Sequence, residues 1–291
     1  MFSSTSIENF NIPPNLSQID DRWCFVSSNL KKVTISASNK NFKYLDEEHQ
    51  IIVGKSDKNT EIFDTIIFAN RCIKHSTIPQ YIKYIKPHSF EKCKKLETLE
   101  IPENSQITSF PDNFTSPLVK SIFIQLNVEV LGDYLLYGSS GLQSITLSPL
   151  NKNFNYLDDE HQIVVGKSDK NKEIFDAIIF ASRSIKHVTI PKYIKCIKPF
   201  AFENCRQLET VEIENDSELE IIDIFASSFA SSLKEIRIPK NVRKIKRYVF
   251  FCCESFQKVL FEEGSKVCSF QKVYFIHANS LKRLISQITH H

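Results

Sequence analysis

Two copies of a Gly-Lys-Ser motif, at residues 54–56 and 166–168, contain residue types that phosphate chemistry uses. A phosphate-binding loop ends in these types, because its backbone amides and its lysine together hold phosphate oxygens. The first glycine of such a loop would stand where this chain has His49 and His161. The residues that follow each histidine are typical of a strand and a turn. The sequence therefore predicts no nucleotide site.

Carboxylates gather beside a histidine just before this motif, at residues 46–49 and again at residues 158–161. Such groups serve in general acid–base catalysis when a cleft fixes a partner opposite them. The sequence shows no such partner and no nucleophile signature, so we interpret both segments as solvated turns. His75 and His187 occupy equivalent positions too far apart to share a metal ion. We predict a protein that is not an enzyme, without catalytic residues, metal site or cofactor.

Lysine and arginine are concentrated at residues 240–247, where they alternate with apolar residues, and lysines recur in equivalent positions at residues 83–86 and 195–198. These cations are interpreted either as a solvated ridge or as a surface that attracts an anionic glycan or phosphates. The net charge is only +3 over 291 residues. The basic run also lacks the interleaved exposed aromatic residues of a nucleic-acid channel, so we predict no nucleic-acid partner.

A long internal repeat supplies the elements that position these residues. Residues 39–101 recur as residues 151–213, at an offset of 151 − 39 = 112, with roughly three positions in four identical. A hexamer, apolar-x-x-apolar-x-apolar, recurs with a basic period of 96 − 73 = 23 residues. Because side chains alternate along a strand, its fourth and sixth residues should face the core. The hexamers begin at Ile7, Leu30, Ile73, Leu96, Val119, Leu142, Ile185, Leu208, Leu233 and Phe256, with a truncated copy at Leu281.

A second pattern, Ile-Pro-x-x-Ile-x-x-Ile-x-x-x-x-Phe-x-x-Cys, occupies residues 78–93 and 190–205, and weaker copies begin at Ile12 and Ile238. With the hexamers, it resembles the BspA-type leucine-rich repeats of bacterial and protist surface antigens, over nearly the whole chain. The resemblance implies a mainly β leucine-rich-repeat solenoid, with a curved parallel sheet on its concave face and short strands and helical turns on its convex side. We predict one continuous solenoid over residues 1–291, with about ten units of roughly 23 residues.

Two long units, at residues 30–72 and 142–184, contain extra segments that look like β-hairpins. In the first, residues 49–55 and 61–69 flank a Ser-Asp-Lys-Asn turn. Consecutive apolar residues in the second strand predict burial of both its faces. The two hairpins are interpreted either as a recent duplication of one structural cassette or as two equivalent binding or self-association elements. A homo-oligomer formed through the hairpins or the solenoid ends remains open.

Three of the eight cysteines, Cys93, Cys205 and Cys253, share one position of the repeat. We expect them to be buried as small hydrophobic residues. The others, which include Cys24 and Cys252, fall irregularly. We interpret the cysteines as free thiols, with a disulfide framework as the alternative.

The third and fifth residues of each hexamer should point outward and make up a binding face. Most are short and polar, which also suits a solvated strand face. Phe123 and Leu260 are apolar exceptions, and we predict them as anchors for a partner. The candidate binding residues are His75, Thr77, Thr98, Glu100, Phe123, His187, Thr189, Glu212, Arg237, Lys258 and Leu260.

These observations predict a non-enzymatic module that binds a protein or glycan through its concave face. The resemblance to surface antigens would make it an adhesin, at the cell surface or secreted. An intracellular scaffold and a self-associating structural protein are the alternatives. The first residues lack a conventional secretory signal, so a cytoplasmic location is the alternative. No segment approaches the roughly 20 apolar residues of a transmembrane helix.

Overall fold

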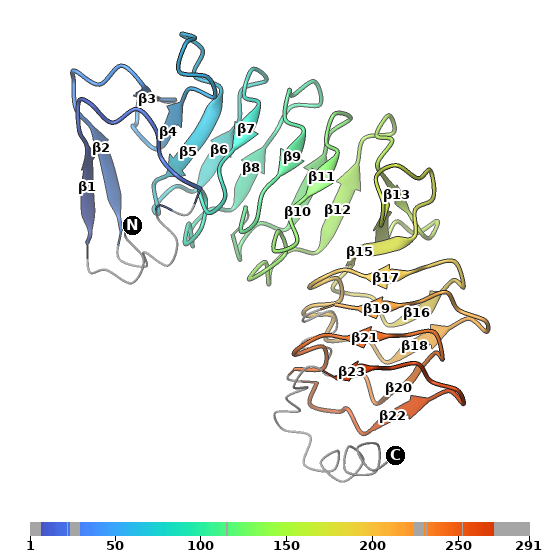
Figure 1. The fold of residues 1–291 in the computed structure, drawn as a ribbon. Helices are drawn as coiled ribbons and strands as arrows, with labels where there is room; N and C mark the ends of the chain where they lie inside the picture. The colour runs from blue at the N-terminus through green and yellow to red at the C-terminus, as the bar shows by residue number, and fades with distance from the viewer. Residues whose placement is uncertain are drawn as a thin grey trace. The chain divides into compact units, whose positions relative to one another are not determined.

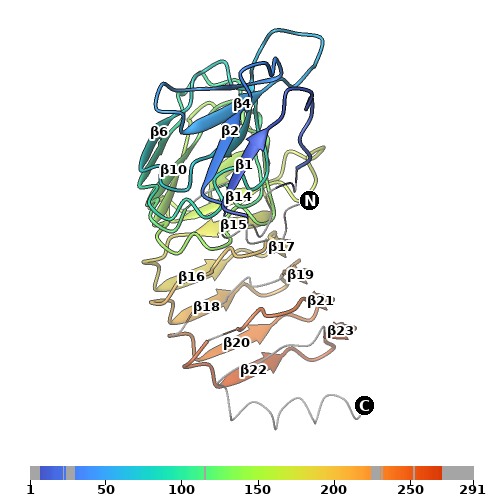
Figure 2. The ribbon, with the colours of Figure 1, turned by 90° about the vertical axis from the view of Figure 1, so that its left-hand side faces the viewer.

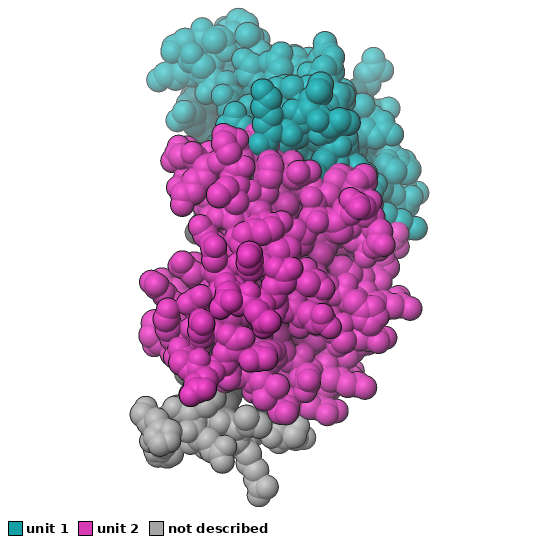
Figure 3. Space-filling view, turned by 90° about the vertical axis from the view of Figure 1, so that its right-hand side faces the viewer, with its two compact units in different colours: residues 1–142, 146–152 teal, residues 143–145, 153–291 magenta. Residues whose placement is uncertain are grey.

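The computed structural model describes residues 7–21, 23, 30–114, 116–223, 230, 232–251 and 253–270. These residues form short β-strands joined by turns, without a helix. They belong to two compact units, shown in different colours in Figure 3: residues 1–142 with 146–152, and residues 143–145 with 153–291. Four predicted features lie outside the described residues: Cys24, Cys252, Phe25 at the end of the weaker copy from Ile12, and the truncated copy from Leu281.

The hexamers form strands at the predicted positions. Neighbouring strands pair in parallel in the predicted register: Asn9 lies opposite Lys32 and His75 opposite Thr98, each 23 residues apart. Figure 2 shows this row in the second unit, where β16, β18, β20 and β22 follow one another. Among the described residues the hexamer strands are β1 (Asn9–Ile12), β2 (Lys32–Ile35), β6 (His75–Thr77), β8 (Thr98–Glu100), β10 (Ser121–Ile124), β12 (Ser144–Leu147), β16 (His187–Ile190), β18 (Thr210–Ile213), β20 (Glu235–Ile238) and β22 (Lys258–Phe261).

A second row of two-residue strands alternates along the chain with the hexamer strands (Figure 1). In five of the units, including those of Ile78 and Ile190, a proline directly follows the hexamer, and it ends the strand because it has no amide hydrogen to donate. In the second row that follows, isoleucines such as Ile85 and Ile197 face inward and are buried. These strands are β7 (Tyr84–Ile85), β9 (Ser109–Phe110), β11 (Val130–Leu131), β17 (Cys196–Ile197), β19 (Ile221–Ile222), β21 (Lys244–Ile245) and β23 (Ser269–Phe270).

Each long unit contributes a three-stranded antiparallel meander to this second row. In the first unit β3 (Phe42–Tyr44), β4 (Ile51–Gly54) and β5 (Thr65–Ala69) pair in sequence, and β5 then pairs in parallel with β7. In the second unit the meander is β13 (Phe154–Tyr156), β14 (Ile163–Gly166) and β15 (Ala177–Ala181). Every residue of β4 and β5 is buried, as the run of apolar residues predicts. The interpretation as a two-stranded hairpin missed the outer strand, which is β3 in the first unit and β13 in the second.

The longest sheet lies in the second row, whereas the prediction gave the main sheet to the hexamers. In the second unit the order is β13-β14-β15-β17-β19-β21-β23, while hexamer strands pair only two by two. The meander adds three strands to this sheet, and β17, β19, β21 and β23 pair continuously beyond it.

Turns with left-handed residues take the place of the predicted helical turns. His88 and Lys92 have φ angles of 65° and 64°, and Phe200 and Asn204 have 61° each in the second copy. A right-handed helix cannot pass through such residues. Residues 87–93 therefore form successive turns, and their side chains Phe90 and Cys93 are buried.

The core lies between the two rows of strands. It contains the inward residues of the hexamers, the isoleucines of the second pattern and several fully buried phenylalanines. Cys93, Cys205 and Cys253 are buried within it, as predicted. Burial raises the pKa of the Cys205 thiol, whose Sγ lies 3.6 Å from the Ser182 carbonyl oxygen. The described cysteines are free thiols.

Candidate functional site

The Gly-Lys-Ser motif closes a turn. A side chain at Gly54 would meet the Phe42 ring at 3.1 Å, so glycine permits close packing of β3 on β4. The Ser56 amide donates to Asp64 Oδ1 at 2.9 Å, and the Ser56 hydroxyl donates to Asp64 Oδ2 at 2.8 Å. The amide that a phosphate would need is thus already bonded. Ser168 makes the same two bonds to Asp176, at 2.7 and 2.8 Å.

The acidic segments before this motif are also structural turns. Asp46 accepts hydrogen bonds from the amides of Gln50 and Ile51, at 2.7 and 2.8 Å. His49 has a φ of 57°, and its ring stacks on Tyr44 with 3.9 Å between centroids. Among the residues that the structure describes, no three metal-ligand side chains cluster.

The lysines of the predicted basic ridge lie beside acidic side chains. Lys86 Nζ is 2.5 Å from Asp21 Oδ1, and Lys246 Nζ is 2.8 Å from Asp223 Oδ2. The ridge lysines are therefore largely compensated, which weakens the interpretation as an anion-binding surface. Three further pairs are longer: Lys83–Asp64 at 4.0 Å, Lys195–Asp176 at 3.9 Å and Lys240–Asp216 at 3.7 Å.

The outward residues of the hexamer strands form what we call the hexamer face. In the first unit hydrogen bonds join them from one rung to the next. His75 Nδ1 lies 2.9 Å from Thr98 Oγ1, and Thr77 Oγ1 donates to Glu100 Oε2 at 3.2 Å. These contacts hold the side chains in defined positions.

The second unit presents a comparable row. His187 Nδ1 lies 2.8 Å from Thr210 Oγ1, and Arg237 Nε lies 3.3 Å from Glu262 Oε1. Ten of the predicted binding residues are exposed: His75, Thr77, Thr98, Glu100, His187, Thr189, Glu212, Arg237, Lys258 and Leu260.

A hollow of about 630 Å³ opens on the hexamer face of the first unit, beside β8 and β10. Leu118, which is 45% exposed, stands in it as an apolar side chain. Two predicted residues, Thr98 and Glu100, belong to this hollow, and the rest of the lining is Glu97, Leu99, Lys120 and Ser121.

Phe123, the predicted anchor, is half-buried and does not line this hollow. It lines a small separate cavity with Leu99, Phe114 and Ile122. Sequence reasoning missed Leu118 because it precedes the hexamer, outside the alternating positions. It also missed Glu97 and Lys120. Each is the second residue of its hexamer, and this shared position could have indicated that the two side chains lie close together.

Comparison with known families identifies the repeats. The profile of the BspA type leucine rich repeat region matches residues 1–46, 59–160 and 168–288, in six copies. The chain belongs to the BspA-type leucine-rich repeat family. No curated protein matches this BspA-type chain in sequence.

Solved structures share the fold. The chain is similar to the pneumococcal vaccine antigen PcpA, with a TM-score of 0.57, 17% identity, 82% of this chain covered and 55% of that one. It therefore spans about half the length of that antigen. A leucine rich cell surface protein from Faecalibacterium prausnitzii has a TM-score of 0.56 and 15% identity, with 95% of this chain and 87% of that chain covered. A leucine-rich repeat protein from Eubacterium ventriosum has a TM-score of 0.52 and 17% identity, with 87% of this chain and 66% of that chain covered.

Within the described part of this BspA-type chain, there is no helix that could cross a membrane.

Proposed function

We propose that the chain is a non-enzymatic binding protein of the surface-antigen kind, which takes a protein ligand on the hexamer face of its first unit. The hollow beside Leu118 carries this proposal. An exposed apolar side chain surrounded by carboxylates and hydroxyls is typical of the centre of a protein-binding surface. The similar structures described as a vaccine antigen and a cell surface protein support an extracellular role by analogy of fold.

The charges around the hollow indicate which partner it suits. The lining has two carboxylates, Glu97 and Glu100, and one cation, Lys120, so the hollow has an excess of negative charge. The bond from Thr77 fixes Glu100 and lowers the entropy lost on binding. A partner that inserts an apolar side chain with a lysine or arginine nearby would match both features.

Surface plasmon resonance with a panel of purified extracellular proteins tests the proposal. For a protein that binds, we expect Leu118→Asp to weaken the affinity by about tenfold or more, and Thr98→Ala by less than about threefold. Leu150→Asp is the matched control, because Leu150 is 68% exposed in the same unit but outside the hollow. Equal binding by the parent protein and Leu118→Asp would remove the hollow from the binding surface.

An intracellular scaffold that uses the same face is the second candidate, and the described free thiols favour it. Antibody labelling of intact source cells separates the two, with permeabilised cells as the control for presence of the protein. Labelling of intact cells supports the surface protein, whereas labelling only after permeabilisation supports the scaffold.

A further inference from the structure

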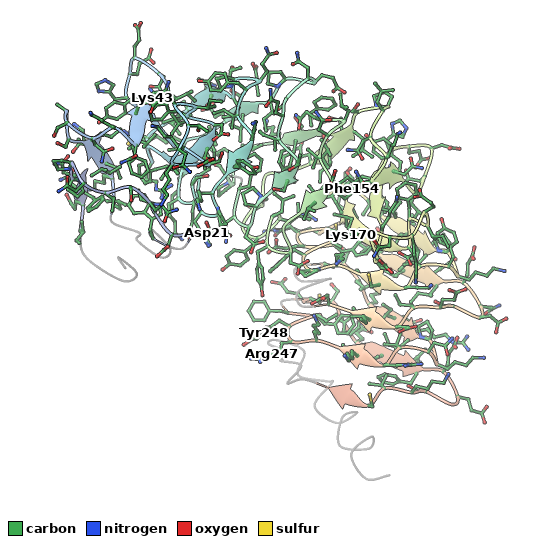
Figure 4. The ribbon with its side chains drawn as sticks, turned by 45° about the horizontal axis from the view of Figure 1, so that its top comes forward. Asp21, Lys43, Phe154, Lys170, Arg247 and Tyr248 are labelled. Carbon is green, nitrogen blue, oxygen red and sulfur yellow. The ribbon has the colours of Figure 1, made fainter. Side chains whose placement is uncertain are left out.

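A second hollow, of about 850 Å³, lies in the first unit along the second row of strands. Its floor contains Thr65 from β5, Tyr84 from β7 and Ser109 from β9. Residues 17–21 form one wall, which includes Asp21, labelled in Figure 4. The meander turn at residues 55–57 forms another wall. We call this hollow the Tyr84 groove.

The cations of the Tyr84 groove already have acidic partners. Lys86 Nζ lies 2.5 Å from Asp21, and Lys55 Nζ lies 3.0 Å from Glu61 Oε2. The Lys55 side chain is only 5% exposed, and its ammonium group also lies 5.2 Å from the centre of the Phe63 ring. An anionic ligand would have to compete with these internal partners. The groove therefore favours a ligand without negative charge.

Other hydrogen-bonding groups and one exposed aromatic ring also line the groove. One of these groups, Asp57, accepts a hydrogen bond from the Asn59 amide on Oδ1 at 2.9 Å. The exposed carboxylates of Asp20 and Asp57 and the hydroxyls of Ser17 and Ser109 line it. Tyr84 is 48% exposed, so part of its ring is open to a ligand. An apolar platform with a few convergent polar groups is the composition of a small-molecule site.

We propose that the Tyr84 groove binds a neutral oligosaccharide. The apolar C–H face of a sugar ring packs on an aromatic ring, while its hydroxyls donate to carboxylates and exchange hydrogen bonds with serines. A hollow of about 850 Å³ has room for more than one sugar unit. This site is separate from the protein-binding hollow on the hexamer face and does not depend on it.

The second copy of the long unit supplies matched controls. Cys196 replaces Tyr84 there, so the aromatic platform is specific to the first copy. Tyr193 is 43% exposed and Asp169 occupies the position equivalent to Asp57, but neither belongs to the groove.

A glycan array of neutral and acidic oligosaccharides, probed with the full chain, tests the proposal. Isothermal titration calorimetry then measures the affinity of the chain for the neutral oligosaccharide that binds most strongly on the array. We expect Tyr84→Ala and the double variant Asp20→Asn/Asp57→Asn each to weaken its binding by about tenfold. Tyr193→Ala and Asp169→Asn should leave the affinity unchanged, and circular dichroism checks that all variants are folded.

Three outcomes overturn the oligosaccharide site. One is no binding of any neutral oligosaccharide at about 1 mM. Another is binding that survives Tyr84→Ala in a folded variant. The third is binding only of charged probes, with an affinity that falls steeply with salt, which would instead indicate a site for charged ligands. The variant Leu118→Asp should bind the oligosaccharide normally, so failure of this site is distinguishable from failure of the proposed protein-binding surface.

Discussion

Glu91 and Glu203 occupy equivalent positions in the two copies but have different surroundings. In the first copy His88 Nδ1 lies 3.0 Å from Glu91 Oε2. Phe200 replaces His88 in the second copy, and Glu203 is only 6% exposed. Burial raises the pKa of Glu203 from 4.5 to about 7, and the nearby charge of Arg183 offsets part of this effect.

This raised pKa predicts a pH-dependent stability. The folded protein holds the Glu203 proton more tightly than the unfolded chain does. The stability that results from this tighter binding is complete below pH 4.5 and is lost as the pH rises through about 7. We expect Glu203→Gln to increase the free energy of unfolding at pH 8 by up to about 3 kcal/mol, with little change at pH 4. Urea unfolding at both pH values measures this difference.

Glu91→Gln is the matched control, because Glu91 has His88 beside it and should show no such gain at pH 8. An equal effect of Glu203→Gln at pH 4 and pH 8 would contradict the assignment of the proton to Glu203.

At the scale of elements, a buried aspartate anchors each meander. Asp176 is 1% exposed and accepts both the amide and the hydroxyl hydrogen bond of Ser168. We expect Asp176→Ala to lower the free energy of unfolding by about 2–3 kcal/mol, because it leaves the Ser168 amide without its acceptor. Ser168→Ala removes only the hydroxyl bond and should cost about 1 kcal/mol.

Chemical denaturation of the two variants, and of Asp64→Ala in the first copy, measures these costs. If Asp176→Ala were no more destabilising than Ser168→Ala, the carboxylate would not be the anchor.

The elements differ in how well the sequence predicted them. The hexamer strands were predictable because alternation and the 23-residue spacing agree at each copy, as the register of Asn9 with Lys32 confirms. The strand β3 was not, since it has only three residues and follows the loop that Asn39 anchors by a 2.7 Å bond to the Pro13 carbonyl oxygen. The turns at His88 and Lys92 were also missed, because neither left-handed position carries glycine.

The candidate site was predicted only in part. Alternation identified Thr98 and Glu100 as outward residues of one hexamer. The hollow also needs Leu118, whose position depends on how the chain enters β10, and a periodic pattern carries no information on that. The Tyr84 groove combines residues 17–21 with the second row, so it depends on packing between distant segments.

At the scale of the whole molecule, contacts between neighbouring rungs dominate each unit. In such repeat proteins the effect of a core substitution should decrease with distance along the stack. We expect Ile190→Ala, at a fully buried position, to destabilise by about 2–4 kcal/mol. Hydrogen exchange measured by mass spectrometry should show the largest loss of amide protection in β16 and β18.

Protection of β1 and β2 should change little in the same variant. A uniform loss throughout the chain would instead mean that both units unfold as one cooperative body. The prediction of one continuous solenoid over residues 1–291 stays a prediction that this experiment also addresses.

The near-identity of the two meanders has a consequence for refolding. β5 and β15 differ at one residue, Thr65 against Ala177, and each must find its own short parallel partner, β7 or β17. An unfolded chain therefore holds two almost interchangeable strands, and pairing β5 with β17 would trap the intervening segment until the pair separates. Divergence between the partner strands, such as Tyr84 against Cys196, makes the two pairings unequal in energy. Such differences between the copies thus reduce the fraction of chains in which β5 or β15 first pairs with the wrong partner strand.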